Sequence, residues 1–440
     1  MTLKDKNILH LISSSLFIFS GLFILSACST GNPGGSTQIE TTTKVISKIE
    51  STSPLTDIPS ASNPDNVVST TADSLVDNLG KPEIKVIEKD DIFDQNKISE
   101  ENKVIKSFEG FSDLYLPSGY APINSDDEIM VLHPSSEGTT VGLLNIKTSE
   151  FNVISTAEPG YSFMYSGEDD TYIVAYRYSL DINAYPVPLE YIIYDRESDN
   201  RTVLDISAIQ KASGAGYIHS YVSIFNGVIY LEIQDRGIAR NDDGVVINFG
   251  DSIYAYDIEK ESLLKIRDSG SSPMVNENGL YFKDFSSDGD SGSLYFIESS
   301  KMLDEESIPE ELVKNCGEYF IHGNKIFYTL DSDNNEIYSY KDGRSELVFT
   351  QPVGIQAWDY RTNGRFITSS YSKEPVYFYD TLKNNLVLLT HKIGGNFSMA
   401  SDKYIVWFEL ENKVPESSGE KEGFKPKYSL KYVEISSLID

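Results

Sequence analysis

The sequence predicts an all-β protein whose folded part is a seven-bladed β-propeller of four-stranded antiparallel blades. Three features recur in one order along the chain: an entrance glycine, a tight turn, and later an apolar strand that contains tyrosine. The repeating unit is about 40–60 residues long, which is typical of a propeller blade. A single twisted sheet cannot bury both of its faces, so such units are stable only when neighbours stack around a ring.

The tyrosine-containing strand ends in a charged residue, and its alternating apolar positions indicate a β-strand. Clear copies lie at 253–257, 294–298, 337–341 and 376–380, and looser copies at 143–147, 191–195 and 430–434. The turns are built from residues that tolerate positive φ: Asp126-Asp127, Asp169-Asp170, Asn226-Gly227, Asn278-Gly279, Gly323-Asn324, Asn363-Gly364 and Ser401-Asp402. The entrance glycines are Gly119, Gly160, Gly216, Gly270, Gly317, Gly354 and Gly395.

The two ends of the repeat region predict how the ring closes. The last unit stops after its third strand, near Ile435, and a spare strand at 112–117 precedes the first entrance glycine. We expect this N-terminal strand to complete the last blade by pairing with Tyr432, Val433 and Glu434, because that pairing removes two free sheet edges.

The repeat resembles bacterial secreted propellers of the TolB-like and YWTD-like kinds. It lacks repeated Trp-Asp strand ends, Gly-Gly kelch pairs and Ser-x-Asp-x-Gly-x-Thr-Trp boxes. The resemblance covers the chain from about Ser112 onward and implies fold and export, but no functional residue.

The first residues predict export and a lipid anchor. Lys4 and Lys6 precede an apolar run that ends in Leu25-Ser26-Ala27-Cys28, which resembles the bacterial lipobox. The resemblance implies that residues 1–27 are a signal peptide and that Cys28 carries the lipid that holds the protein on the membrane, outside the cytoplasm. The alternative is an ordinary transmembrane anchor, because the uncharged run is nearly long enough to span a bilayer.

Composition divides the rest of the chain. Residues 28–92 are rich in Ser, Thr and Pro and have no aromatic residue, so we expect a disordered tether. Residues 93–111 form a lead-in, with a short helix expected over 94–106, and residues 112–440 form the propeller.

Charge and cysteine content exclude several classes of protein. The chain has 67 acidic against 37 basic residues and a formal net charge of −30, which disfavours nucleic-acid binding. With Cys28 committed to lipid, Cys316 is the only other cysteine. We therefore expect no disulfide framework and a buried or inert thiol at Cys316.

Short catalytic and metal patterns occur but are weak. Gly289-Asp290-Ser291-Gly292 and Gly250-Asp251-Ser252-Ile253 match hydrolase motifs over only four residues, and no histidine spacing suggests a partner. Asp331-x-Asp333-x-Asn335 opens like a calcium loop, yet Glu336 stands where glycine is needed. This segment, 288–290 and 242–244 are interpreted as turns, with adventitious Ca²⁺ as the alternative. We predict no metal site and no cofactor.

Insertions between second and third strands are the most informative functional signal. They cover 179–188, 235–250 and 411–427, and binding residues concentrate on such loops because the sheet beneath them is rigid. The alternative is tolerated surface growth. The candidate binding residues are Tyr185, Arg236, Arg240, Asp242 and Phe249.

Two functions remain open at this point. The first is a membrane-anchored binding or scaffold module for a protein or a glycan. The second is an extracellular carbohydrate-active hydrolase or lyase with carboxylates at the channel mouth, where paired acids would lie about 5–10 Å apart.

Overall fold

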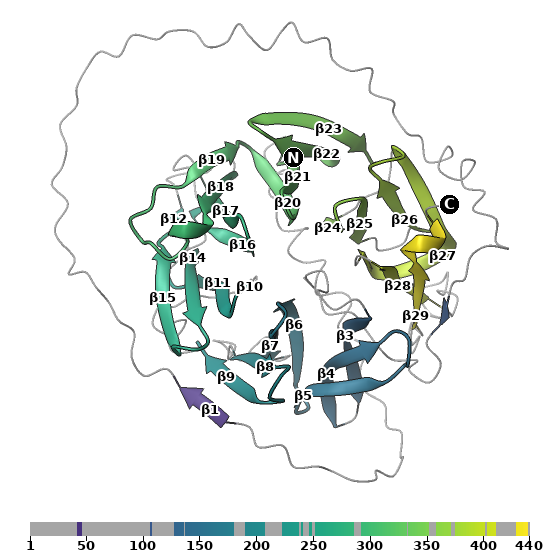
Figure 1. Cartoon of the computed structure of the whole chain (residues 1–440), viewed down its shortest axis with the longest axis horizontal. Coiled ribbons are helices and arrows are strands. Elements are labelled where there is room, and N and C mark those ends of the chain that lie inside the picture. Colours follow the sequence, from purple (N-terminus) through teal and green to yellow (C-terminus); the bar gives the residue numbers. More distant parts are fainter. Residues whose placement is uncertain are drawn as a thin grey trace, which may run out of the picture.

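The computed structural model is all-β, with antiparallel sheets that follow one another around a central axis (Figure 1). In the third, fourth and fifth sheets the first strand lies toward the axis and the last lies at the rim (Figure 1). The structure describes residues 42–45, 106–107, 127–135, 137–179, 190–206, 222–236, 239–240, 246–248, 251–285, 292–331, 333–351, 358–370, 375–400, 403–410 and 428–438.

Within the described residues, five sheets of the ring precede the C-terminal region. The first contains β3 (Glu128–Ser135), β4 (Gly138–Asn145) and β5 (Phe151–Ala157). The second contains β6 (Tyr161–Glu168), β7 (Tyr172–Ser179), β8 (Glu190–Asp195) and β9 (Arg201–Asp205). The third contains β10 (Val222–Phe225), β11 (Val228–Gln234), β14 (Asp251–Asp257) and β15 (Ser262–Arg267). The fourth contains β16 (Ser271–Asn276), β17 (Gly279–Phe285), β18 (Gly292–Glu298) and β19 (Glu310–Val313). The fifth contains β20 (Cys316–His322), β21 (Lys325–Leu330), β22 (Asp333–Lys341) and β23 (Arg344–Thr350).

Six C-terminal strands and the N-terminal strand β2 form one seven-stranded sheet, which divides into two groups at β27 (Asn385–Ala400). The first part of β27, up to Ile393, pairs with β26, and the part from Gly394 pairs with β28. The sixth group therefore contains β24 (Trp358–Thr362), β25 (Phe366–Ser370), β26 (Pro375–Asp380) and the start of β27. The last group contains the end of β27, β28 (Tyr404–Leu410), β29 (Tyr428–Glu434) and β2 (Lys106–Ser107).

The repeated sequence features have the predicted places in these sheets. Six of the seven repeated segments contain tyrosine and fall on the third strands β8, β14, β18, β22, β26 and β29. The looser copy at 143–147 has no tyrosine, and its first three residues lie on β4, the second described strand of its sheet. Five of the seven predicted turns join first to second strands within the described residues, and Asn226 and Gly227 both have positive φ, 51° and 73°. Two consecutive positive φ values give the tight hairpin whose twist matches the flanking strands.

The turns of neighbouring sheets lie on the same side of the ring, which we call the turn face. The backbone N–H of Gly227 in the third sheet donates to Asp169 Oδ2 in the turn of the second sheet, 3.0 Å away. Because the turns share one face, the connections from second to third strands emerge on the opposite one, the loop face. Corresponding bonds join other sheets: Asn276 Nδ2 to Gly323 O at 2.7 Å, Lys325 Nζ to Gly364 O, and Tyr404 Oη to Asp127 Oδ1 at 3.1 Å.

Replacing Asp169 with alanine is expected to lower the free energy of unfolding by about 2 kcal/mol, because its carboxylate accepts three backbone N–H bonds. Oδ1 accepts from Thr171 and Tyr172, and Oδ2 accepts from Gly227 of the next sheet. Asp170→Ala, at the exposed neighbouring position, is the matched control. Urea unfolding measures both variants, and equal effects would contradict a role for Asp169 in joining the two sheets.

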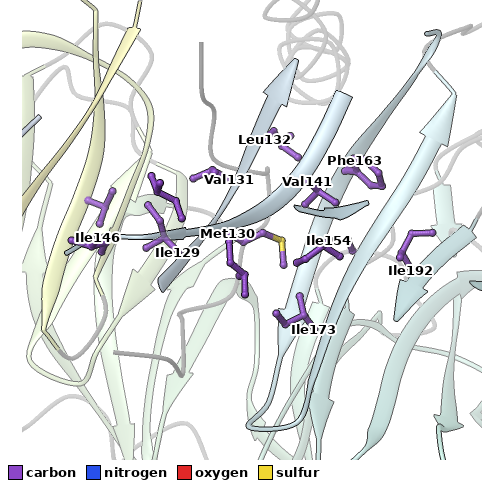
Figure 2. Packing of buried hydrophobic residues seen from close by; sticks show 14 of the residues in the cluster. Ile129, Met130, Val131, Leu132, Val141, Ile146, Ile154, Phe163, Ile173 and Ile192 are labelled. Atoms are coloured by element: carbon purple, nitrogen blue, oxygen red, sulfur yellow. The ribbon is translucent and has the colours of Figure 1, made fainter. Parts of the chain in front are cut away.

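The core consists of apolar clusters between successive sheets. Figure 2 shows Val141 and Ile154 of the first sheet beside Phe163, Ile173 and Ile192 of the second. The same cluster includes buried Tyr404, Val406 and Tyr432, so the last group packs against the first sheet. The other clusters join the second to the third sheet, the third to the fourth, the fourth to the fifth, the fifth to the sixth group, and the sixth to the last group.

The N-terminal partner of the last group differs from the predicted one. β2 pairs antiparallel with β29, with Lys106 opposite Tyr432 and Ser107 opposite Lys431. β29 has β28 on its other side, so both of its edges are occupied where we expected residues 112–117, and that register prediction is wrong. Residues 112–117 lie outside the described part of the chain, as do 94–105 of the expected helix. Lys106, its expected last residue, is in a strand.

One further strand lies in the segment predicted as a tether. β1 (Thr42–Val45) pairs in parallel with β9, the last strand of the second sheet. Among the described residues no helix is long and apolar enough to cross a membrane.

Candidate functional site on the loop face

The insertion in the third sheet carries a hairpin of its own. β11 ends at Gln234 and β14 begins at Asp251, and these two residues are directly paired. Between them, β12 (Ala239–Arg240) and β13 (Val246–Asn248) form a separate two-stranded sheet. The insertion therefore begins and ends at one point of a rigid sheet, which holds its base in place.

Arg236 links the two sides of this base. Its guanidinium Nη2 donates to the backbone carbonyl of Asp251, 3.0 Å away, and its Nε lies 3.5 Å from Asp235 Oδ1. The Arg236 side chain remains 41% exposed. Arg236 thus closes the base of the loop while part of its side chain remains exposed.

Asp235 is the centre of the hydrogen bonds beneath the insertion. Its carboxylate accepts from Ser252 Oγ at 2.8 Å and Tyr254 Oη at 2.7 Å, and it lies 2.9 Å from Lys265 Nζ. Burial opposes ionisation of this carboxyl, but the bonds from Lys265, Tyr254 and Ser252 outweigh it and hold the pKa below its usual value. Asp235 is therefore a stable negative charge at the foot of the loop.

The pKa values of two nearby carboxyls, those of Asp251 and Glu232, are raised rather than lowered. Burial is the main cause that raises the pKa of Asp251 to about 6; the charge of Arg236 lowers it and that of Asp235 raises it. Glu232 is buried and accepts the backbone N–H of Ser272 at 2.5 Å. Burial, followed by the charge of Asp251, raises the pKa of Glu232 well above its usual value. The third sheet thus places three carboxyls with different proton affinities near one end of its central strands β11 and β14.

The insertion in the second sheet has a similar base. Arg177 on β7 is paired in register with Glu190 at the start of β8, and its Nη2 donates to the Glu190 carboxylate. Its Nη1 donates to Glu158 Oε2 at 3.1 Å, and the guanidinium lies 5.4 Å from the centroid of the Tyr161 ring. Both insertions therefore start beside an arginine that bonds to the first residue of the following strand.

The structure describes only part of the predicted binding set. Arg236 lies at the base of the insertion, and Arg240 lies on β12, where the backbone alone is described. Tyr185, Asp242 and Phe249 lie outside the described residues, as does Cys28. Sequence reasoning missed Arg177, Glu190, Asp235 and Asp251 as a set, because each of these contacts depends on strand register.

The weaker sequence motifs have structural roles where they are described. Ser252 donates to Asp235 and, at 3.2 Å, to the carbonyl of Asp268. Asp331 lies in a turn after β21 and accepts the N–H of Gly292 at 3.1 Å, as the turn interpretation expects, whereas Asp333 and Asn335 lie on β22. Cys316 is a free, buried thiol, and burial raises its pKa to about 12. Among the described residues no group of three or more His, Cys, Asp or Glu could hold a metal ion.

The raised pKa of Asp251 predicts a pH-dependent effect of Asp251→Asn. The folded-state pKa of about 6 exceeds the usual aspartate value of 3.8, so the folded wild type binds more protons between these values and loses stability as pH rises through this window. The asparagine variant avoids this loss. Its stability relative to wild type should rise by on the order of 2 kcal/mol between pH 4 and 7, measured by urea unfolding. Asp342→Asn, at an exposed turn, is the control, and a parallel rise in both variants would contradict the assignment.

Comparison with known proteins supports the fold. No protein-family model matches the sequence, and no curated protein does. A solved oligogalacturonate lyase in complex with manganese matches with a TM-score of 0.50 and 9% identity, over 76% of this chain and 94% of that chain. Oligogalacturonate lyase from Vibrio parahaemolyticus matches with a TM-score of 0.50 and 11% identity, over the same shares.

The β-propeller domain of the Trilobed protease from Pyrococcus furiosus has a TM-score of 0.40 and 15% identity, over 58% of this chain and 80% of that chain. At such identities a likeness shows the fold alone. The two lyase matches, together with the ring of mostly four-stranded antiparallel sheets, show that this chain is a β-propeller.

Proposed function

We propose that this protein is an extracytoplasmic lipoprotein, anchored through Cys28, whose propeller binds a protein or glycan ligand on the loop face. In this proposal the propeller has seven blades, and β2 closes the ring by completing the last one. The observation that carries the binding role is the shared construction of two insertions on adjacent sheets. Each starts beside an arginine, Arg177 or Arg236, that bonds to the first residue of the next strand.

Ligand recognition explains insertions that are fixed in this way better than tolerated surface growth does. A loop held at both ends by one strand pair loses less conformational freedom when a ligand binds. In this proposal the Arg236 side chain, which is 41% exposed, donates hydrogen bonds to carboxylate or hydroxyl groups of the ligand. A protein surface or an acidic glycan presents such acceptors.

Binding is tested by capture from envelope fractions of the source organism with the full chain. In one variant a Gly-Ser linker replaces residues 237–249 of the loop face, and in the matched control Lys341 and Asp342 on the turn face become serine. We expect the wild type and the control, but not the loop variant, to retain the same protein or polysaccharide. Equal retention by all three would contradict binding through this insertion.

Cys28→Ala is expected to release the protein from the membrane, because this thiol is the only predicted attachment point for lipid. Two acyl chains hold a protein stably, since each buried CH₂ contributes about 0.8 kcal/mol. Detergent-phase partitioning of wild type and variant measures the effect. Unchanged partitioning of the variant would contradict lipidation and favour a transmembrane anchor.

A second candidate is a carbohydrate-active hydrolase or lyase. The observation that favours it is the opposite shift of two neighbouring carboxyls: the pKa of Asp235 lies below its usual value and that of Asp251 rises to about 6. Such a pair can supply an acid and a base near neutral pH. Cleavage of acidic oligosaccharides that is lost in Asp251→Asn but kept in Asp342→Asn would support it.

A further inference from the structure

We propose that residues 42–45 dock as an added strand on the rim of the second sheet and so turn this side of the propeller toward the membrane. This inference rests on the proposed lipid anchor at Cys28. It goes beyond that function because it states which side of the domain faces the lipid, and therefore how the loop face is presented.

The docking is defined by strand register. Thr42 pairs with Thr202, Thr43 with Val203, Lys44 with Leu204 and Val45 with Asp205, all in parallel. β9 pairs with β8 on its inner side, so β1 occupies its outer edge, and Figure 1 shows β1 outside the ring next to β9. The outer edge of a sheet presents unpaired N–H and C=O groups, which an extended segment can satisfy.

The sequence of residues 42–45 favours an extended strand. Three of its four residues, Thr42, Thr43 and Val45, are β-branched, and such residues favour extended backbone. β15, β19 and β23 are the corresponding rim strands of the next three sheets, and each has a single described neighbour. Among the described strands the added one is therefore specific to the second sheet.

Docking changes how far the propeller can lie from its anchor. Fourteen residue steps separate Cys28 from Thr42, and at 3.3–3.6 Å per residue they reach at most about 50 Å. Without docking, the first described contact with the ring is at Lys106, 78 steps from Cys28, with a maximal reach of roughly 270 Å. The docked strand therefore keeps the rim of the second sheet near the bilayer, and the loop face looks sideways along the membrane.

The docking itself is tested by cross-linking in the full chain. Under mild oxidation Thr42→Cys/Thr202→Cys should form a disulfide, because paired strands lie about 4.8 Å apart. The matched control, Thr42→Cys/Ser262→Cys, places the second thiol at an exposed position on the rim of the third sheet and should not cross-link. Equal or absent cross-linking in the two variants would overturn docking on β9.

The orientation is tested with the lipidated chain on vesicles whose headgroups carry an energy-transfer acceptor. A donor dye is placed at Asn200→Cys beside β9, or at Glu346→Cys on β23 across the ring; both positions are exposed. We expect at least twofold stronger transfer from position 200. Thr43→Pro/Lys44→Pro should abolish the difference, and Ser51→Pro/Thr52→Pro should keep it.

The two readouts separate failure of this inference from failure of the proposed function. Detergent partitioning without the Thr42–Thr202 cross-link would leave the lipid anchor standing and overturn docking. The cross-link without partitioning would leave the docked strand standing and overturn both the anchor and the orientation. Equal transfer from positions 200 and 346 in a lipidated, cross-linkable chain would overturn the orientation alone.

Discussion

Trp407→Ala is expected to lower the free energy of unfolding by about 3–5 kcal/mol, because it empties a fully buried indole site. Trp407 lies on β28 with 0% exposure and packs with Phe366 and Phe378 of the sixth group and with Ile405 and Val433 of its own. The large cavity would loosen the contact between the last two groups of strands. Since β2 pairs with the last group, the N-terminal strand would be weakened with it.

Thermal and urea unfolding measure this effect, with Trp407→Phe as the control that keeps an aromatic ring in the cluster. We expect the phenylalanine variant to lose less than half as much stability as the alanine variant. Hydrogen exchange at Lys106 and Ser107 should rise in Trp407→Ala. A loss below about 1 kcal/mol would show that the last group contributes little to the global stability.

The predicted strands and turns of the second to sixth groups are confirmed because their signals are local. Alternating apolar residues report which face of a strand is buried, and Asn226-Gly227 reports a hairpin because few other residues accept two positive φ values. The same argument explains why the tyrosine-containing segments of the second and later sheets fall on third strands. Their buried tyrosines, such as Tyr191, Tyr254 and Tyr379, fill the space between neighbouring sheets.

Features that depend on pairing between distant segments were beyond the sequence pattern. β2 has only two residues, which is too short to show any alternation, so residues 112–117 were the more plausible closing strand. β27 runs from the sixth group into the last group through Gly394 without a turn. The sequence therefore has no turn residues there that would predict the boundary between the two groups. The contact of Arg236 with Asp251 spans an insertion, and only the register of β11 against β14 brings them together.

The role of the entrance glycines could be predicted only in part from the sequence. Their recurrence predicted the boundaries of the repeating units, but the sequence could not say which of them are required by geometry. Gly160 and Gly270 have positive φ, 96° and 147°. Their surroundings differ: a Cβ at Gly160 would meet nothing within 4 Å, whereas one at Gly270 would lie 2.8 Å from Ile253 Cδ1 and 3.0 Å from Phe282 Cδ2.

Gly270→Ala is therefore expected to lower the free energy of unfolding by about 3 kcal/mol, from the positive φ and from overpacking. Gly160→Ala, which has the backbone cost without the contact, should lose only about 1 kcal/mol. Ile253 and Phe282 are 0% and 1% exposed, so the added methyl cannot be accommodated by rotation into solvent. Adding Ile253→Val to Gly270→Ala removes the atom nearest to the new Cβ and should restore about 1 kcal/mol relative to the sum of the single effects. Strict additivity in this double-mutant cycle would show that Gly270 is required for its backbone conformation alone.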